Sequence, residues 1–188
     1  MLDAALARRL KLIGLDVDGV LTDGGIFIGQ AGDHPVELKR FHIQDGLGVR
    51  MLREAGLTVV FASARRSDAT DQRARELKVD EVVQDHQKLP AFEAVLERRG
   101  IRWDECAFVG DDLPDLPVLR RVALPIAVAN AVAEVKAAAK LVTTSSGGQA
   151  AVREVAELIL TARDEWQDLV TKYCVERGDV ASGHERPR

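Results

Sequence analysis

The stretch LDVDGVLTDG at residues 15–24 brings three aspartates, Asp16, Asp18 and Asp23, to the end of the apolar run LKLIGL. A short apolar run bounded by turn residues is typical of a buried strand. Carboxylates crowded at the end of such a strand repel one another, by about 4 kcal/mol for two charges roughly 4 Å apart at an effective dielectric constant of about 20. The stretch therefore indicates a buried strand whose acidic end needs a neutralising cation.

Further along the chain, short apolar runs alternate with longer amphipathic stretches. Strands are predicted over residues 10–17, 56–63, 80–84, 105–111, 124–130 and 139–144. Helices are predicted over residues 45–55, 67–78, 90–99, 114–121 and 131–138, with a final helix from about 148 to 176. This alternation predicts an α/β fold, a Rossmann-like parallel sheet with helices on both faces.

One segment, residues 24–43, interrupts the alternation. Two strand-like runs flank a turn rich in Gly, Asp and Pro, which predicts a β-hairpin inserted after the first strand. The 188 residues suffice for one domain with a substantial core, predicted to span residues 1–176. The polar end, residues 177–188, lacks periodicity and is predicted to be a disordered tail.

Composition excludes several classes of protein. The net charge of −4 argues against a nucleic-acid binder, which usually carries a basic field. The two cysteines, Cys106 and Cys174, lie far apart, which argues against a disulfide framework or a zinc site. The N-terminus lacks a secretory pattern, and no run approaches the roughly 20 apolar residues of a membrane span. A soluble cytoplasmic protein is expected.

Polar side chains follow the predicted strands at the same end. In an open parallel sheet, ligands bind outside the carboxyl ends of the strands. The side chains delivered there are Asp16 and Asp18, then Ser63, Arg65 and Arg66, then Lys88, and finally Asp111 and Asp112. Each alone has an ordinary explanation, as a helix cap, a turn residue or a surface lysine. Their coincidence at one edge favours a functional site.

These residue types indicate phosphoryl transfer. Ligands that are all oxygen atoms favour magnesium over zinc, and a lysine with a hydroxyl suits a phosphoryl group held opposite the metal. A carboxylate beside both, such as Asp16, can attack phosphorus and form an aspartyl-phosphate. A second carboxylate two residues on, Asp18, can protonate the leaving alcohol and then deprotonate the attacking water.

The motifs LDVDGVLTDG, FASAR, Lys88 and FVGDDLPDLPVL together resemble the haloacid dehalogenase (HAD) superfamily of phosphotransferases. The stretches FHIQDGLGVRML, QDHQKLPAFEAVL and TSSGGQAAVREVAELIL are similar to the phosphatases of 3-deoxy-D-manno-octulosonate (KDO) 8-phosphate. The resemblance covers residues 10–162. It implies a magnesium-dependent enzyme that hydrolyses this sugar-acid phosphate through an aspartyl-phosphate, in lipopolysaccharide precursor biosynthesis. The phosphatases of nonulosonate (sialic acid or KDN) 9-phosphates are close relatives, so that substrate stays open.

The resemblance also implies roles for individual residues. The implied catalytic residues are Asp16 as nucleophile, Asp18 as acid and base, Ser63 and Lys88. The implied magnesium contacts are Asp16, the carbonyl of Asp18 and Asp111, with Asp112 as a supporting carboxylate. The implied substrate contacts are Asp18, His42, Ile43, Gln44, Asp45, Gly46, Arg50, Arg65, Arg73 and Lys88. The chain departs from the family pattern at Ala64, usually glycine, and at Gln44, usually arginine.

Relatives of this type lack a large cap domain and form tetramers in which the inserted hairpins cover neighbouring active sites. A two-stranded ribbon cannot bury its own apolar residues, so a homotetramer joined through residues 24–43 is expected; the alternative is a hairpin folded onto its own subunit. Two other functions stay open. A receiver domain uses the same groups but places the acceptor aspartate after a middle strand. A catalytically slow regulatory module descended from the phosphatase would be consistent with Ala64 and Gln44, although Asp16, Asp18 and Lys88 are intact.

Overall fold

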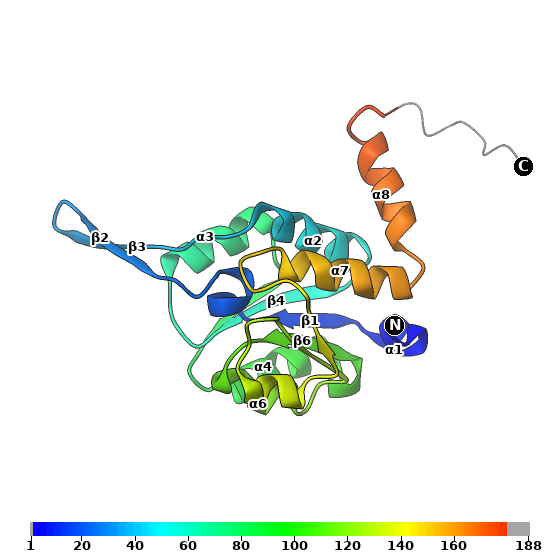
Figure 1. The fold of residues 1–188 in the computed structure, drawn as a ribbon, viewed down its shortest axis with the longest axis horizontal. Helices are drawn as coiled ribbons and strands as arrows, with labels where there is room; N and C mark the ends of the chain where they lie inside the picture. The colour runs from blue at the N-terminus through cyan, green and yellow to red at the C-terminus, as the bar shows by residue number, and fades with distance from the viewer. Residues whose placement is uncertain (1, 180–188) are drawn as a thin grey trace, which may run out of the picture.

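Six parallel strands form the central sheet, in the order β5-β4-β1-β6-β7-β8 (Figure 1). The computed structural model describes residues 2–179. The strands are β1 Leu12–Leu15, β4 Thr58–Ser63, β5 Glu81–Gln84, β6 Cys106–Gly110, β7 Leu124–Ala127 and β8 Leu141–Val142. All neighbouring pairs in this sheet are parallel. The predicted α/β fold is confirmed.

Helices cover both faces of the sheet, as the alternation predicted. The helices are α1 Ala4–Arg9, α2 Ile43–Glu54, α3 Asp68–Leu77, α4 Lys88–Arg99, α5 Leu116–Leu119, α6 Ala133–Ala138, α7 Ala151–Ala162 and α8 Trp166–Val175. In Figure 1, α2, α3 and α7 lie on one side of the sheet, and α4 and α6 lie on the other. No helix within residues 2–179 is long and apolar enough to cross a bilayer.

The central strand β1 is wholly buried, and its position determines where its acidic end lies. At Gly14 the absence of a side chain lets aromatic rings approach, because a Cβ atom there would lie 2.4 Å from Phe108 and 2.7 Å from Phe92. These two rings pack edge to face with centroids 5.5 Å apart. Leu15 is in register with Phe61 of β4 and Val109 of β6, so the three strands end within two residues of one another.

The predicted hairpin is present as a separate two-stranded antiparallel sheet, β2 Phe27–Ala31 and β3 His34–Leu38. It projects from the body of the fold (Figure 1), and most of its residues are exposed. An isolated bridge between Thr22 and Phe41 closes its base. The hairpin therefore begins and ends beside the loop that follows β1.

The prediction of one helix over residues 148–176 is wrong, because the chain breaks between α7 and α8. Asp164 has a left-handed backbone with φ of 63°. The amide of Asp164 donates to the carbonyl of Thr161, and the amide of Glu165 donates to the carbonyl of Leu160. These hydrogen bonds around a left-handed residue commonly end a helix. The left-handed residue is usually glycine, but aspartate can also adopt this conformation. Of the predicted tail, residues 180–188 lie outside the described residues, and residues 177–179 follow the end of α8.

Candidate active site

Three carboxylates form a cluster at the carboxyl edge of the sheet. Asp16 directly follows β1, Asp111 directly follows β6, and Asp115 ends the short turn Leu113–Asp115. One oxygen from each carboxylate lies within 4.8 Å of the others. The loop after β1 can approach this closely because Gly19, with φ of 107°, has no side chain; a Cβ atom there would lie 2.1 Å from Asp111 Oδ2.

Lys88, in the first turn of α4, is the cation of this cluster. Its side chain is 3% exposed, and its Nζ donates to Asp16 and, at 2.6 Å, to Asp115 Oδ1. Burial, followed by the charge of Asp115, raises the pKa of Asp16 well above its ordinary range, and the same two causes raise the pKa of Asp111 to about 7. Burial by itself lowers the pKa of Lys88, but Asp16 and Asp115 more than offset this, so the lysine stays protonated.

The charge and the atoms of the cluster fit one divalent cation. Three ionised carboxylates against one ammonium group leave two negative charges in a largely buried place. The carboxylates of Asp16, Asp111 and Asp115 offer only oxygen atoms, which are the ligands that magnesium prefers. The cation predicted from the sequence therefore has a site. Asp115, which was not predicted, adds its negative charge to this site, while its two oxygens accept from Lys88 and from the amide of Asp111.

Asp18 lies within an irregular helical turn, Val17–Leu21, and both oxygens of its carboxylate have partners. Ser63 Oγ donates to Asp18 Oδ2 at 3.2 Å, and Lys39 Nζ lies 2.7 Å from Asp18 Oδ1. The structure thus brings Ser63 and Asp18 together, as expected from the sheet edge. Ala64 is not among the residues with positive φ within residues 2–179, so this loop does not use the backbone freedom of glycine.

The structure separates the two aspartates at 111 and 112. Asp112 is exposed, and its carboxylate accepts from the amide of Leu113 at 2.7 Å, which caps the turn that follows. Asp115 is buried and accepts from the amide of Asp111 at 3.0 Å. Sequence reasoning missed Asp115, although it stands in the same stretch, GDDLPD, as Asp111. The supporting role of Asp112 stays a prediction.

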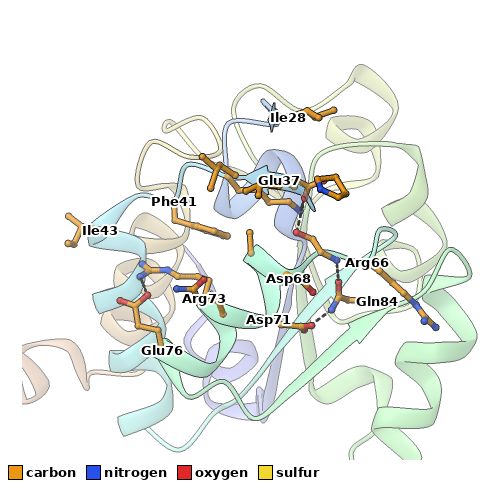
Figure 2. Close-up of a pocket in the computed structure, with 17 residues that line it drawn as sticks. Ile28, Glu37, Phe41, Ile43, Arg66, Asp68, Asp71, Arg73, Glu76 and Gln84 are labelled. Carbon is orange, nitrogen blue, oxygen red and sulfur yellow. Dashed lines mark hydrogen bonds and ion pairs between the residues drawn. The ribbon is translucent and has the colours of Figure 1, made fainter. Parts of the chain in front are cut away.

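Some predicted substrate contacts lie around a hollow of about 1250 Å³ between β3, the start of α2 and α3 (Figure 2). Ile43 and Arg73 line it. The Arg73 guanidinium lies over the Phe41 ring at 5.6 Å and donates to the carbonyl of His42 at 3.5 Å. A Cβ atom at Gly46 would lie 2.8 Å from Arg73 Nη2, so Gly46 leaves room for this guanidinium.

Three other predicted contacts have different surroundings. Arg50 forms an ion pair with Glu54 and, through Nη2 at 2.8 Å, with Glu176 beyond α8. Arg65 pairs with Glu37 of the hairpin at 2.8 Å. Gln44 is exposed on the first turn of α2.

Comparison with known proteins identifies the family. The 3-deoxy-D-manno-octulosonate 8-phosphate phosphatase KdsC of Escherichia coli K12 is 39% identical over 160 residues, which are 85% of this chain and 84% of that protein. The chain belongs to this phosphatase family. The enzyme of Salmonella typhi is 39% identical over 158 residues, covering 84% of this chain and 82% of its own. A model of haloacid dehalogenase-like hydrolases also matches residues 81–155.

Solved structures agree with membership of the octulosonate 8-phosphate phosphatase family. The enzyme of Moraxella catarrhalis, crystallised with a magnesium ion, a phosphate ion and a KDO molecule, superposes with a TM-score of 0.85 at 36% identity, covering 90% of this chain and 97% of its own. The Yersinia pestis enzyme gives a TM-score of 0.83 at 36% identity, covering 87% and 88%. The resemblance stated from the sequence motifs is confirmed.

Asp45, a predicted substrate contact in this phosphatase, caps a helix instead of facing the hollow. Its side chain is buried, and Oδ1 accepts from the amide of Arg153 at 2.8 Å in the first turn of α7. The residue that precedes α7, Ala150, has no side chain that can do this. Asp45 therefore joins α2 to α7 across the sheet face.

Replacing Asp45 with alanine is expected to lower the free energy of unfolding by about 1 kcal/mol, the usual effect of losing a cap. Asp45→Asn keeps an acceptor oxygen and removes a buried charge whose pKa burial has raised, so it is expected to stay within about 0.5 kcal/mol of the wild type. Urea unfolding measures both. Asp68→Ala is the matched control, since Ser67 and not Asp68 caps α3. Equal losses for Asp45→Ala and Asp68→Ala would contradict a capping role.

Proposed function

We propose that this chain hydrolyses 3-deoxy-D-manno-octulosonate 8-phosphate to the free sugar acid and phosphate. The observation that carries the proposal is the buried group of Asp16, Lys88, Asp111 and Asp115 beside the paired Asp18 and Ser63. It lies in a chain that shares 39% identity with a phosphatase of this name over most of both sequences. The regulatory-module alternative rests on Ala64 and Gln44, whereas Asp16, Asp18, Ser63 and Lys88, which the proposed chemistry uses, are all present in the chain.

The proposed reaction has two steps. Lys88 Nζ donates a hydrogen bond to Asp16 Oδ1, so Oδ2 is the oxygen that attacks phosphorus. As the new O–P bond forms, the ester O–P bond breaks, and Asp18 gives its proton to the leaving alcohol. In the second step Asp18 takes a proton from water, the water oxygen attacks phosphorus, and Asp16 leaves with both electrons of its bond. Bound magnesium supplies positive charge that reduces repulsion between Asp16 and the phosphoryl oxygens.

Two cationic side chains are suited to the sugar acid. Its carboxylate requires a positive partner besides the groups that hold the phosphate, and a planar guanidinium binds a carboxylate through two hydrogen bonds. Arg73 lines the hollow. Arg65 forms an ion pair with Glu37, which also lines the hollow. All three arginines are paired, Arg73 with Glu76. We assign the carboxylate of the substrate to Arg73 and Arg65 and not to Arg50, because Arg50 does not line the hollow.

The test is phosphate release from a panel of sugar phosphates with magnesium. KDO 8-phosphate is expected to give the highest kcat/KM, by at least about tenfold over nonulosonate 9-phosphates, since a pocket that pairs substrate groups rejects poorly matched ones. A faster reaction with a nonulosonate 9-phosphate would show that this compound is the substrate, and the proposed two-step chemistry would still hold. No release from any sugar phosphate would refute the phosphatase itself.

Removing magnesium is expected to abolish activity and to weaken the fold most at neutral pH. Unfolded aspartate has a pKa of about 3.9, whereas the pKa of folded Asp111 is about 7 and that of Asp16 is also raised. Groups with a raised folded pKa contribute stability below the unfolded pKa, and that stability is lost as the pH rises through the folded value. The metal-free protein therefore loses stability between about pH 4 and pH 7.

Added magnesium should accordingly raise the melting temperature more at about pH 7.5 than at about pH 5, because fewer protons compete for Asp16 and Asp111. Scanning fluorimetry after EDTA treatment, with and without magnesium at each pH, measures the difference. Potassium chloride of equal ionic strength is the control for screening. A shift in melting temperature that does not vary with pH would show that these carboxylates do not hold the ion.

We also propose that the chain assembles as a homotetramer through its hairpins. Phe27 and Leu38 lie opposite each other in the ribbon, and each is about 60% exposed; Ile28 is 83% exposed. Contiguous exposed apolar side chains mark an interaction surface. A second copy of the same hairpin offers a complementary partner, since closed symmetric assemblies join like surfaces.

The Leu38→Lys variant is expected to sediment as a smaller species than the wild type, because each buried lysine would lack a counter-charge. Sedimentation equilibrium measures the mass. Val175→Lys, at an exposed apolar residue of α8, is the matched control and should keep the wild-type mass. A wild-type protein that sediments as a single chain would refute the tetramer.

A further inference from the structure

Lys39 is a buried lysine that no sequence motif singled out. It follows β3 at the base of the hairpin, and its side chain is 0% exposed. Its Nζ lies 2.7 Å from Asp18 Oδ1, 3.2 Å from Thr70 Oγ1 and 3.7 Å from Glu37 Oε1. Burying an ammonium group is unfavourable unless it is paired. A lysine buried there in spite of this, with Asp18 as its nearest carboxylate, indicates a role beyond solubility.

The contacts of Lys39 leave the Asp18 carboxylate little freedom to turn. Lys39 holds Oδ1 from one side, and Ser63 donates to Oδ2 from another. The two partners come from different elements, the hairpin base and the end of β4. Two fixed donors on two oxygens define the plane of a carboxylate, which one donor would leave free to rotate.

Lys39 is in turn held by the hairpin and α3. Glu37 accepts from Ser67 Oγ at 2.7 Å and pairs with Arg65 at 2.8 Å. The hydrogen bond from Ser67, and then the charges of Arg65 and Lys39, keep the pKa of Glu37 below its usual value, so its charge persists beside the lysine. Thr70, fully buried in α3, supplies the remaining acceptor.

We infer that Lys39 is a positioning residue that fixes the orientation of the Asp18 carboxylate as the base that takes a proton from the attacking water, because a carboxylate that accepts from both Lys39 and Ser63 is in its ionised form. The inference rests on the proposed phosphatase function. Proton transfer requires the base within hydrogen-bond reach of the water, and a misplacement of about 1 Å can lower a rate by about a hundredfold. Lys39 lines the hollow, but its side chain is 0% exposed, and its Nζ already contacts Asp18, Thr70 and Glu37.

The first test is the kinetics of Lys39→Met with KDO 8-phosphate and magnesium. The kcat is expected to fall about 10- to 100-fold with KM within about twofold, since only proton transfer is misaligned. Lys39→Arg, which keeps the charge, should recover part of the loss. Lys11→Met is the matched control, because Lys11 pairs with Glu105 at 2.7 Å beyond the opposite edge of the sheet, and it should keep the wild-type kcat. A rise in KM with unchanged kcat would make Lys39 a substrate ligand and overturn the inference.

The second test is a double-mutant cycle with Asp18→Asn. If Lys39 acts through Asp18, adding Lys39→Met to Asp18→Asn should change kcat by less than about twofold. A penalty as large as in the wild-type background would show a general structural role and overturn the inference. If Lys39→Met does not fold by circular dichroism, the cycle is run with Lys39→Gln, which is also neutral but keeps a hydrogen-bond donor.

Crystal structures of the wild type and of the Lys39 variant test the inference independently of the substrate. The Asp18 carboxylate is expected to leave Ser63 or to occupy several rotamers once Lys39 is replaced. An unchanged Asp18 rotamer would overturn the inference even if the enzyme acts on another phosphate. A wild-type protein that releases no phosphate refutes the proposed function, whereas an active wild type with an indifferent Lys39 variant refutes only this inference.

Discussion

The Asp16→Asn variant is expected to release phosphate at least about 10³-fold more slowly than the wild type, because an amide oxygen cannot form the covalent intermediate that divides the reaction into two steps. Asparagine has the shape of aspartate and keeps an acceptor for Lys88, which also retains its pair with Asp115 at 2.6 Å. The loss should therefore appear in kcat with little change in KM. Phosphate release with KDO 8-phosphate and saturating magnesium measures it.

The fold is expected to survive Asp16→Asn, which separates catalysis from stability. Burial, and then Asp115, raise the pKa of Asp16, so its negative charge is unfavourable in the metal-free protein at neutral pH. Removing that charge should leave the metal-free melting temperature unchanged or higher. Asp104→Asn, at an exposed aspartate remote from the cluster, is the matched control and should keep full activity. Near wild-type turnover in Asp16→Asn would refute Asp16 as nucleophile.

Much of the site was predictable because parallel strands share one edge. The apolar run of β1 predicted a buried strand, and the residues after β1, β4 and β6 then had to lie at its carboxyl end. Asp16 and Asp111 meet there, and Ser63 donates to Asp18 beside them. Lys88 was predicted just ahead of a helix, and it begins α4. Each of these placements follows from local pattern together with one topological rule.

The rest depends on contacts between distant segments that leave no local trace. In the sequence Lys39 looks like a surface lysine at the end of an exposed hairpin, yet its side chain is buried because the chain returns past Asp18. Asp45 reads as a residue of a helix start, but its partner is the amide of Arg153, which is 108 residues away. The break at Asp164 was missed because no glycine marks it. Partners chosen by tertiary packing are visible only in the folded chain.

Replacing Lys88 with methionine is expected to lower the free energy of unfolding by about 3–5 kcal/mol at about pH 7.5 without magnesium, the usual effect of removing one partner of a buried ion pair. Asp16 and Asp115 would then lie buried with no counter-charge, and Asp111 nearby adds a third negative charge. At about pH 5 the loss should be smaller, since the raised pKa of Asp16 and Asp111 lets them take up protons. Urea unfolding at both pH values measures the effect.

Activity in Lys88→Met is expected to fall at least about 10²-fold, because nothing then offsets the repulsion between Asp16 and the phosphoryl oxygens. Lys11→Met, which removes a partly exposed lysine from its pair with Glu105, is the matched control and should cost no more than about 1 kcal/mol. If Lys88→Met unfolds at the same urea concentration as the wild type at both pH values, the carboxylates of Asp16, Asp111 and Asp115 are hydrated and not buried from water.

The double variant Lys88→Met with Asp115→Asn separates the two roles of the lysine. Removing one charge of each sign returns the cluster to the two negative charges that a divalent cation neutralises. Stability and the magnesium-induced rise in melting temperature should then recover most of their wild-type values, because the excess buried charge is gone. Activity should not recover, since the phosphoryl group still lacks a cation opposite the metal. Recovery of both would mean that Lys88 serves only to balance charge, and recovery of neither would mean that Asp115 binds the metal through its charge.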